Sequence, residues 1–140
     1  MAYVRVEGGA RLRRTLKKAG VDMKVLRAIN KRAATTVSTA STASAPVGGP
    51  YRNTGRGRPK SGGRLKATVR PGATTKAGII RAGTGAAGRV PYANPIHWGW
   101  AARNIKPQPW MTLAAQATEP VWVADYNRHM RQVIKQVKGK

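Results

Sequence analysis

The distribution of acidic residues is the feature that most constrains this chain. No acidic residue lies between Asp22 and Glu119, whereas sixteen lysines and arginines fall in that interval. The 140 residues carry 27 Lys and Arg against 4 Asp and Glu, a net charge of +23. Ion pairs within the chain cannot neutralise this excess, and phosphate is the usual counter-charge of such a surface. The composition therefore favours a place close to nucleic acid, with a solubilising surface or acidic protein neighbours as the alternatives.

The apolar residues predict a small core. Hydrophobic residues make up 41% of the chain, but many are alanines, phenylalanine is absent and aromatic residues reach only 6%. We expect a single domain over residues 1–140, with long exposed loops and a core that neighbouring subunits complete. Cysteine is absent, which excludes disulfides and thiolate metal ligands. We further expect a soluble chain without a signal peptide, because charge precedes any apolar run and no apolar stretch reaches about 20 residues.

The N-terminal third predicts a strand and two helices. The alternating residues 3–6 predict the strand, and residues 10–19 predict the first helix, with Gly20 in the left-handed conformation after its end. Asp22 has the side chain of an N-cap for a second, longer helix, which a Ser/Thr/Ala-rich tail weakens and Pro46 ends. Apolar residues three or four apart predict one stripe along this helix: Val25, Leu26, Ile29, Ala33, Val37 and Ala40.

The middle of the chain predicts a flexible basic loop and a hairpin. Residues 46–63 are dense in Gly, Pro and Arg and cannot hold a regular element. The alternation in residues 64–70 predicts a half-buried strand, with Leu65, Ala67 and Val69 on its buried face. A turn follows, and residues 77–82 predict the partner strand.

The C-terminal third predicts two helices that meet at a proline. The first covers residues 110–117, and Thr118 caps a last helix that Pro120 begins. The apolar face of this last helix holds Trp122, Tyr126, Met130, Val133 and Val137. Together the elements predict an α+β fold, in which a small antiparallel sheet packs with N-terminal and C-terminal helices and a long basic loop emerges.

Two glycine-rich segments look like nucleotide-binding loops but lack the required partners. Residues 83–88, GTGAAG, match a dinucleotide-binding pattern, yet Pro91 and Pro95 forbid the long helix that must follow. The pattern also needs an acidic residue about 20 positions further on to bind the ribose, but the next acid in the chain is Glu119. Residues 55–63 resemble a phosphate loop superficially, with proline rather than glycine before the lysine. Both segments are better interpreted as loops.

The two histidines do not predict a catalytic site. No carboxylate is placed in the sequence to orient His97 or His129, and four acids are too few for an acid–base pair together with metal ligands. A histidine beside a tryptophan, as at His97, is more often a packed structural residue. We therefore expect no enzyme activity, no bound metal and no cofactor.

The basic loop is the candidate nucleic-acid contact. Its side chains have the charge and reach to touch a DNA backbone without reading sequence, and a solvated loop is the alternative. The candidate DNA-facing residues are Arg52, Arg56, Arg58, Lys60 and Arg64.

The segment PYANPIHWGWAARNIKPQPW (91–110) holds three of the four tryptophans and four of the nine prolines. We expect Gly99 to let the chain reverse, and Trp98 and Trp110 to anchor the structure. Because Trp and Tyr dominate protein interfaces, the segment favours packing or protein contact over stacking on single-stranded bases. The candidate packing or interface residues are Tyr92, Trp98, Trp100, Trp110 and Trp122.

The order of these segments resembles the tail-completion, or neck, protein family of long-tailed bacteriophages, also described as minor tail or head–tail connector proteins. The matching positions are Pro46 and Val47, residues 63–66, Tyr92 and Ala93 with residues 97–99, and residues 109–111. The chain departs from the family pattern in two features. An extra basic loop follows Val47, and His97 stands where many relatives carry Glu.

The resemblance implies a structural virion protein at the head–tail junction or the top of the tail, assembled as a homo-oligomeric ring around the DNA passage. It implies contacts with other neck, stopper, tail-terminator or tail-tube proteins, and sequence-independent electrostatic contact with genomic DNA. Its expected location is the neck or tail of the virion, after assembly in the host cytoplasm, without membrane contact. Composition alone favours the alternative, a small basic monomer that binds nucleic acid without sequence specificity.

Overall fold

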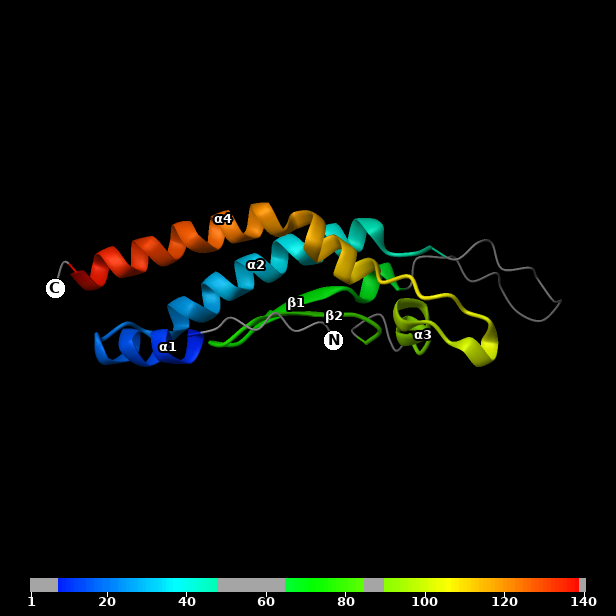
Figure 1. Ribbon diagram of the computed structural model, residues 1–140, viewed down its shortest axis with the longest axis horizontal. Helices are drawn as coiled ribbons and strands as arrows, with labels where there is room; N and C mark the ends of the chain where they lie inside the picture. Colours follow the sequence, from blue (N-terminus) through cyan, green and yellow to red (C-terminus); the bar gives the residue numbers. More distant parts are fainter. Residues whose placement is uncertain (1–7, 48–64, 85–89, 139–140) are drawn as a thin grey trace.

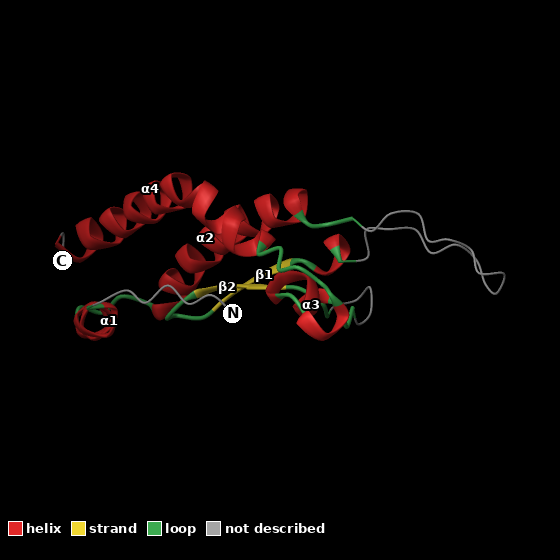
Figure 2. Cartoon of the chain, turned by 45° about the vertical axis from the view of Figure 1, so that its right-hand side comes forward, coloured by secondary structure: helices red, strands yellow, loops and turns green. Residues whose placement is uncertain are grey.

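The computed structural model describes residues 8–47, 65–84 and 90–138. The helices are α1 (Gly9–Lys18), α2 (Met23–Ser44), α3 (Ala93–Trp98) and α4 (Trp110–Lys138), and the strands are β1 (Arg70–Ala73) and β2 (Gly78–Arg81). Helix α2 lies between α4 and the β1–β2 hairpin, with α1 at one end of the molecule and α3 at the other (Figures 1 and 2). The predicted α+β fold, an antiparallel sheet packed with N-terminal and C-terminal helices, is confirmed. The expected strand over residues 3–6 falls outside the described residues.

The junction between α1 and α2 is set by two local signals, as predicted. Gly20 has φ +80° and follows the end of α1. Its N–H donates to the Lys17 carbonyl, and the Val21 N–H donates to the Leu16 carbonyl, which is the Schellman pattern of a helix end. Asp22 then caps α2, because its Oδ1 accepts a hydrogen bond from the Lys24 N–H at 2.9 Å.

Helix α2 stays regular through its Ser/Thr-rich tail and ends at Ser44, before Pro46. Hydroxyls along it donate to the carbonyl four residues earlier, for example Thr42 to Ser38 at 2.8 Å, so they compete little with the helix. Its buried side is wider than the predicted stripe, because α2 is covered on two sides. Asn30, Ala34, Ser38 and Ser41 are buried in addition to Leu26, Ile29 and Val37, whereas Val25 is exposed.

The predicted strand over residues 64–70 is wrong. Residues Lys66–Thr68 form a 3₁₀ turn, and the strand begins only at Arg70, opposite Arg81. Residues three apart share a side of a 3₁₀ turn, so Leu65 and Thr68 are buried while Ala67 is exposed. The Thr68 hydroxyl donates to the Leu65 carbonyl and accepts from the Gly83 N–H, which closes the base of the hairpin.

The hairpin packs directly on α2. The Asn30 side chain donates to the Thr74 carbonyl at 3.0 Å, and Lys31 Nζ donates to the Pro71 carbonyl at 2.6 Å. Gly78 opens β2 so close to α2 that a Cβ there would lie 2.6 Å from the Asn30 carbonyl oxygen. The predicted partner strand over residues 77–82 is confirmed as β2.

The C-terminal third is one helix rather than two. Helix α4 runs through Pro120 without a break, so Thr118 is not an N-cap; its hydroxyl donates to the Ala114 carbonyl at 2.7 Å. A proline inside a helix removes one backbone hydrogen bond and bends the axis, and α4 is visibly bent (Figure 1). The helix continues because its packing along α2 spans both sides of the proline.

The apolar residues form two small clusters at opposite ends of the α2–α4 pair. The first joins α1, α2 and α4 through Leu16, Leu26, Ile29, Met130 and Val133. Tyr126 and Val137 pack against it, which confirms most of the predicted apolar face of the last helix. The second cluster lies under α3 and consists of Ala45, Leu65, Val90, Ala93 and Trp110.

Candidate interaction surface

The aromatic segment folds back on itself at Gly99, as predicted. Helix α3 ends there with φ +81°, and a Cβ on Gly99 would lie 2.9 Å from Pro107 Cδ. Beyond it, Trp100 and Ile105 pair through two backbone hydrogen bonds of 2.8 and 3.0 Å. The Gln108 N–H donates to the Ile96 carbonyl, which ties the returning chain to α3. The residues between α3 and α4 are therefore held in one defined position.

His97 is the internal link between α3 and α4. Its ring is 4% exposed, lies edge-on to Trp98 and Trp110, and places Nε2 3.5 Å from Thr112 Oγ1. Burial lowers the pKa of His97, because desolvation disfavours the charged ring. The ring is therefore packed, as expected for a histidine beside a tryptophan.

The aromatic side chains divide into buried and exposed members. Trp110 is 4% exposed and packs in the second cluster, so it is buried as an anchor would need to be. Trp98 is 54% exposed, so the expectation that it is a second buried anchor is wrong: α3 turns His97 inward, and Trp98 faces outward. Tyr92 and Trp100 are also exposed, at 42% and 46%. We call these three exposed aromatic residues of the segment 91–110, taken together, the aromatic surface: Tyr92, Trp98 and Trp100.

The aromatic surface is basic as well as apolar. Arg103 lies over the Trp100 ring, with its guanidinium carbon 5.1 Å from the ring centroid, and Lys106 is exposed nearby in the sequence. Every ion pair among the described residues involves Asp125, and none includes Arg103 or Lys106. Exposed tryptophans with cations suit a protein contact or a stacked base.

A second uncovered apolar surface runs along the first half of α4. Its members recur three or four positions apart and therefore share one side of the helix. Leu113 and Val121 are 57% and 61% exposed. We call this surface the α4 stripe; its exposed members are Leu113, Ala117, Pro120, Val121 and Ala124. Trp122 lies beside it, half-buried, with its indole N–H donating to the Ala115 carbonyl at 3.2 Å.

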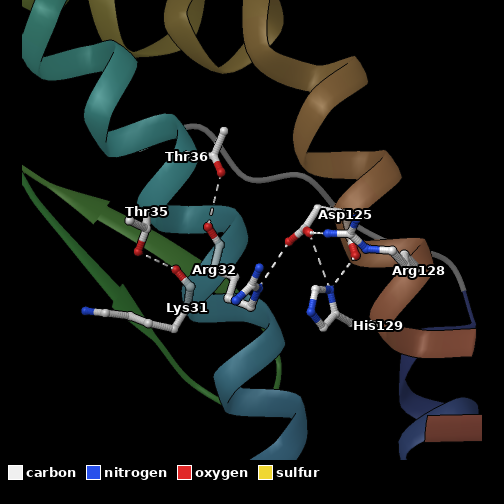
Figure 3. Close-up of polar contacts among 7 residues, drawn as sticks. All are labelled: Lys31, Arg32, Thr35, Thr36, Asp125, Arg128 and His129. Carbon is white, nitrogen blue, oxygen red and sulfur yellow. Dashed lines mark hydrogen bonds and ion pairs between the residues drawn. The ribbon is translucent and has the colours of Figure 1, made fainter. Parts of the chain in front are cut away.

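Asp125 forms an ion cluster that joins α2 to α4 (Figure 3). Arg32 Nε donates to Asp125 Oδ2 at 3.3 Å, and Arg128 pairs with Oδ1. His129 Nδ1 lies 2.8 Å from the Asp125 backbone carbonyl and 3.5 Å from Oδ1. The hydrogen bond from Arg32, assisted by that from Arg128, lowers the pKa of Asp125.

This cluster overturns the sequence statement that no carboxylate is placed to orient His129. Asp125 precedes His129 by four positions on one helix, a spacing that puts both side chains on the same side. That spacing was visible in the sequence, whereas the partner Arg32, 93 positions away, was not. Among the described residues, no group of three His, Asp or Glu side chains could hold a metal ion.

The predicted basic-loop residues Arg52, Arg56, Arg58, Lys60 and Arg64 lie outside the described residues, as do most of residues 83–88. Within the described part of that glycine segment, the Gly83 N–H donates to Thr68 Oγ1 at 2.8 Å. None of the helices described is long and apolar enough to cross a membrane. No family model matches this chain, and neither a curated protein nor a solved structure matches it.

Proposed function

We propose that this chain is a structural virion protein of a tailed bacteriophage, a component of the head–tail connector that assembles as a ring around the DNA passage. The resemblance of its ordered segments to the tail-completion family supplies the viral context. The observation that carries the proposal is that one chain leaves two different apolar surfaces uncovered, the aromatic surface and the α4 stripe. Large exposed apolar patches mark interaction sites.

Two different surfaces favour a ring over a symmetric pair. A two-fold dimer buries the same patch on both copies, whereas contact between two different patches leaves each copy with one free patch and repeats. Such head-to-tail repetition closes into a ring when the rotation between copies allows it. In this arrangement the aromatic surface of one copy packs on the α4 stripe of the next, and tryptophans supply the main anchors.

The acidic residues of the described chain support a structural role. Asp22 caps α2 and Asp125 joins α2 to α4. Glu119 is exposed on α4, with no histidine among its neighbours in the helix. General acid–base chemistry needs groups held within hydrogen-bond reach of one another and of a substrate. Asp22 and Asp125 instead serve the fold.

The test is assembly measured by light scattering after size-exclusion chromatography, with electron microscopy of the eluted particles. The wild-type chain is expected to pass from monomer to one discrete closed oligomer as its concentration rises. Changing Trp98 and Trp100 together to Ser should hold the chain monomeric. The control Leu12→Ser, which removes an exposed apolar side chain on α1, should assemble like the wild type.

A mixing experiment distinguishes a ring contact from a two-fold contact. The double variant Leu113→Ser/Val121→Ser should also stay monomeric, because it lacks the α4 stripe. Mixed with the tryptophan variant, it should form dimers and nothing larger, because each partner retains one intact surface. A wild type that is monomeric at every concentration, with or without DNA, would reject the ring and support the monomeric nucleic-acid-binding alternative.

A further inference from the structure

Three helices that meet at one end of the molecule carry basic residues at the same spacing. In α1, in the first half of α2 and in the second half of α4, Lys or Arg occurs at positions n, n+3 and n+7. Residues at this spacing lie on one side of an α-helix. The three triads are Arg11, Arg14 and Lys18; Lys24, Arg27 and Lys31; and Arg128, Arg131 and Lys135.

Each triad lies on the side of its helix opposite a buried apolar residue. All nine basic residues are exposed, and the apolar residues at n+5 are Leu16, Ile29 and Val133. These three belong to the first apolar cluster, which joins the helices. This end of the molecule therefore has a small apolar centre and an exterior rich in basic side chains, among which Leu12, Val25 and Ile134 are also exposed. We call it the basic end.

The described acids do not neutralise the basic end. Asp22 is used as the N-cap of α2, and Asp125 is shared by Arg32, Arg128 and His129. Arg128 is the one triad member with an acidic partner among the described residues. The remaining positive charges repel one another, and that repulsion is relieved when a polyanion binds.

Helix α1 is the most basic element of this end. Five of its ten residues are Lys or Arg and none is acidic. Arg11, Arg14 and Lys18 line its outer side. Arg13, Arg14 and Lys17 line an adjoining open hollow of about 510 Å³ together with Met23 and Thr75, so Arg14 borders both the outer side and the hollow. Basic side chains therefore lie both on the solvent-facing side of α1 and beside its contact with α2.

We propose that the outer side of α1 binds the phosphate backbone of duplex nucleic acid without reading its sequence. From Arg11 to Lys18 the helix rises about 10.5 Å, a length over which duplex DNA carries about six phosphate charges. Helix α1 contains no aromatic residue, and Trp and Tyr are among the residues that most often anchor protein interfaces. Flexible cations on a helix face suit phosphate contacts, which position a protein but carry no sequence information.

This inference rests on the DNA contact in the proposed function and deepens it by assigning the contact to α1. It does not depend on ring formation, because α1 lies at the end of the molecule away from α3 (Figure 1). Assembly and DNA binding are therefore measured separately on the same variants, and failure of one does not imply failure of the other.

The experiment measures fluorescence anisotropy of two unrelated 20-base-pair duplexes over a salt series. The test variant is Arg11→Gln/Arg14→Gln/Lys18→Gln. The matched control, Lys66→Gln/Arg70→Gln/Arg81→Gln, removes the same charge from exposed sites outside both the basic end and the aromatic surface. Glutamine keeps the helix propensity of α1, and circular dichroism checks that both variants are folded.

Both duplexes are expected to bind the wild type alike. The α1 variant should lose at least tenfold in affinity at low salt, and its log–log salt slope should become shallower by up to about 2.7, since each lost phosphate contact removes about 0.9. The control should change both quantities much less. Equal losses in the two triple variants would overturn the assignment to α1, as would a strong preference for one duplex. Poly-glutamate that binds as tightly, with the same dependence on α1, would instead identify an acidic polypeptide as the partner.

Discussion

Replacing Trp110 with alanine should destabilise the fold far more than replacing Trp98. Trp110 is 4% exposed and packs in the second cluster, and its indole N–H has no hydrogen-bond partner among the described residues. The side chain therefore stabilises the fold through apolar burial. Its loss should cost about 3–5 kcal/mol. Trp98 is 54% exposed and makes one edge contact with the His97 ring at 4.4 Å, so its loss should cost about 1 kcal/mol.

The assay is urea unfolding followed by far-ultraviolet circular dichroism, which does not depend on tryptophan emission. With an m-value of about 2 kcal/mol/M, Trp110→Ala should lower the midpoint by about 1.5–2.5 M and Trp98→Ala by about 0.5 M. All variants are compared at one protein concentration, since assembly raises apparent stability. If Trp110→Ala does not fold, Trp110→Phe should show a smaller measurable loss. Equal losses for the two tryptophans would refute the reasoning, because they would mean that Trp110 is not buried in solution.

Two further predictions concern contacts of α2. Because Arg32 lowers the pKa of Asp125, this carboxylate stabilises the fold above its ordinary pKa, and the contribution is lost as the pH falls through the lowered value. The melting temperature of the wild type should therefore fall more steeply below about pH 4 than that of Asp125→Asn. Parallel plots of melting temperature against pH for the two proteins would contradict this. Gly78→Ala should cost about 1–3 kcal/mol in urea unfolding, since the new Cβ would meet the Asn30 carbonyl at 2.6 Å; an unchanged midpoint would show that β2 moves away from α2 without cost.

The sequence predicts best those features that depend on neighbouring residues. Gly20 and Asp22 act within one turn of the chain, and both occupy their predicted positions between α1 and α2. The apolar spacing in α4 is also local, and it identifies Met130 and Val133 as core residues. In these cases the signal and its partner are separated by only a few positions, so no tertiary information is needed.

The errors arise where a distant partner decides the outcome. Alternation in residues 64–70 fits a strand, but β2 offers only four residues to pair with, so the preceding residues satisfy their backbone groups in a turn around Thr68. Pro120 is a sound local signal for a helix boundary. Packing along α2 outweighs it, and α4 continues.

The burial of the tryptophans and the grouping of the basic residues likewise depend on distant partners. Trp98 and Trp110 have similar sequence surroundings, each next to a residue that constrains the backbone. Their burial differs because Trp110 begins α4 inside the second cluster, whereas α3 is so short that it buries His97 and leaves Trp98 outside. The basic triads, in contrast, were present in the sequence as a spacing, but only the packing of three helices on Leu16, Ile29 and Val133 brings them to the exterior of one end of the molecule.

The charge of the chain gives the two proposed interactions opposite responses to salt. Bringing copies of a +23 chain together costs repulsion, which salt screens. The contact between the aromatic surface and the α4 stripe should therefore strengthen as salt rises. Phosphate binding at α1 should weaken as salt rises. Each phosphate contact releases condensed counterions from the DNA, and this release is less favourable at high salt concentration. At low salt, a bound duplex can replace salt as the screen, so DNA should promote assembly there and lose that effect at high salt. A chain that bound DNA only as a monomer would bind DNA more weakly as salt rises, but would not assemble more strongly.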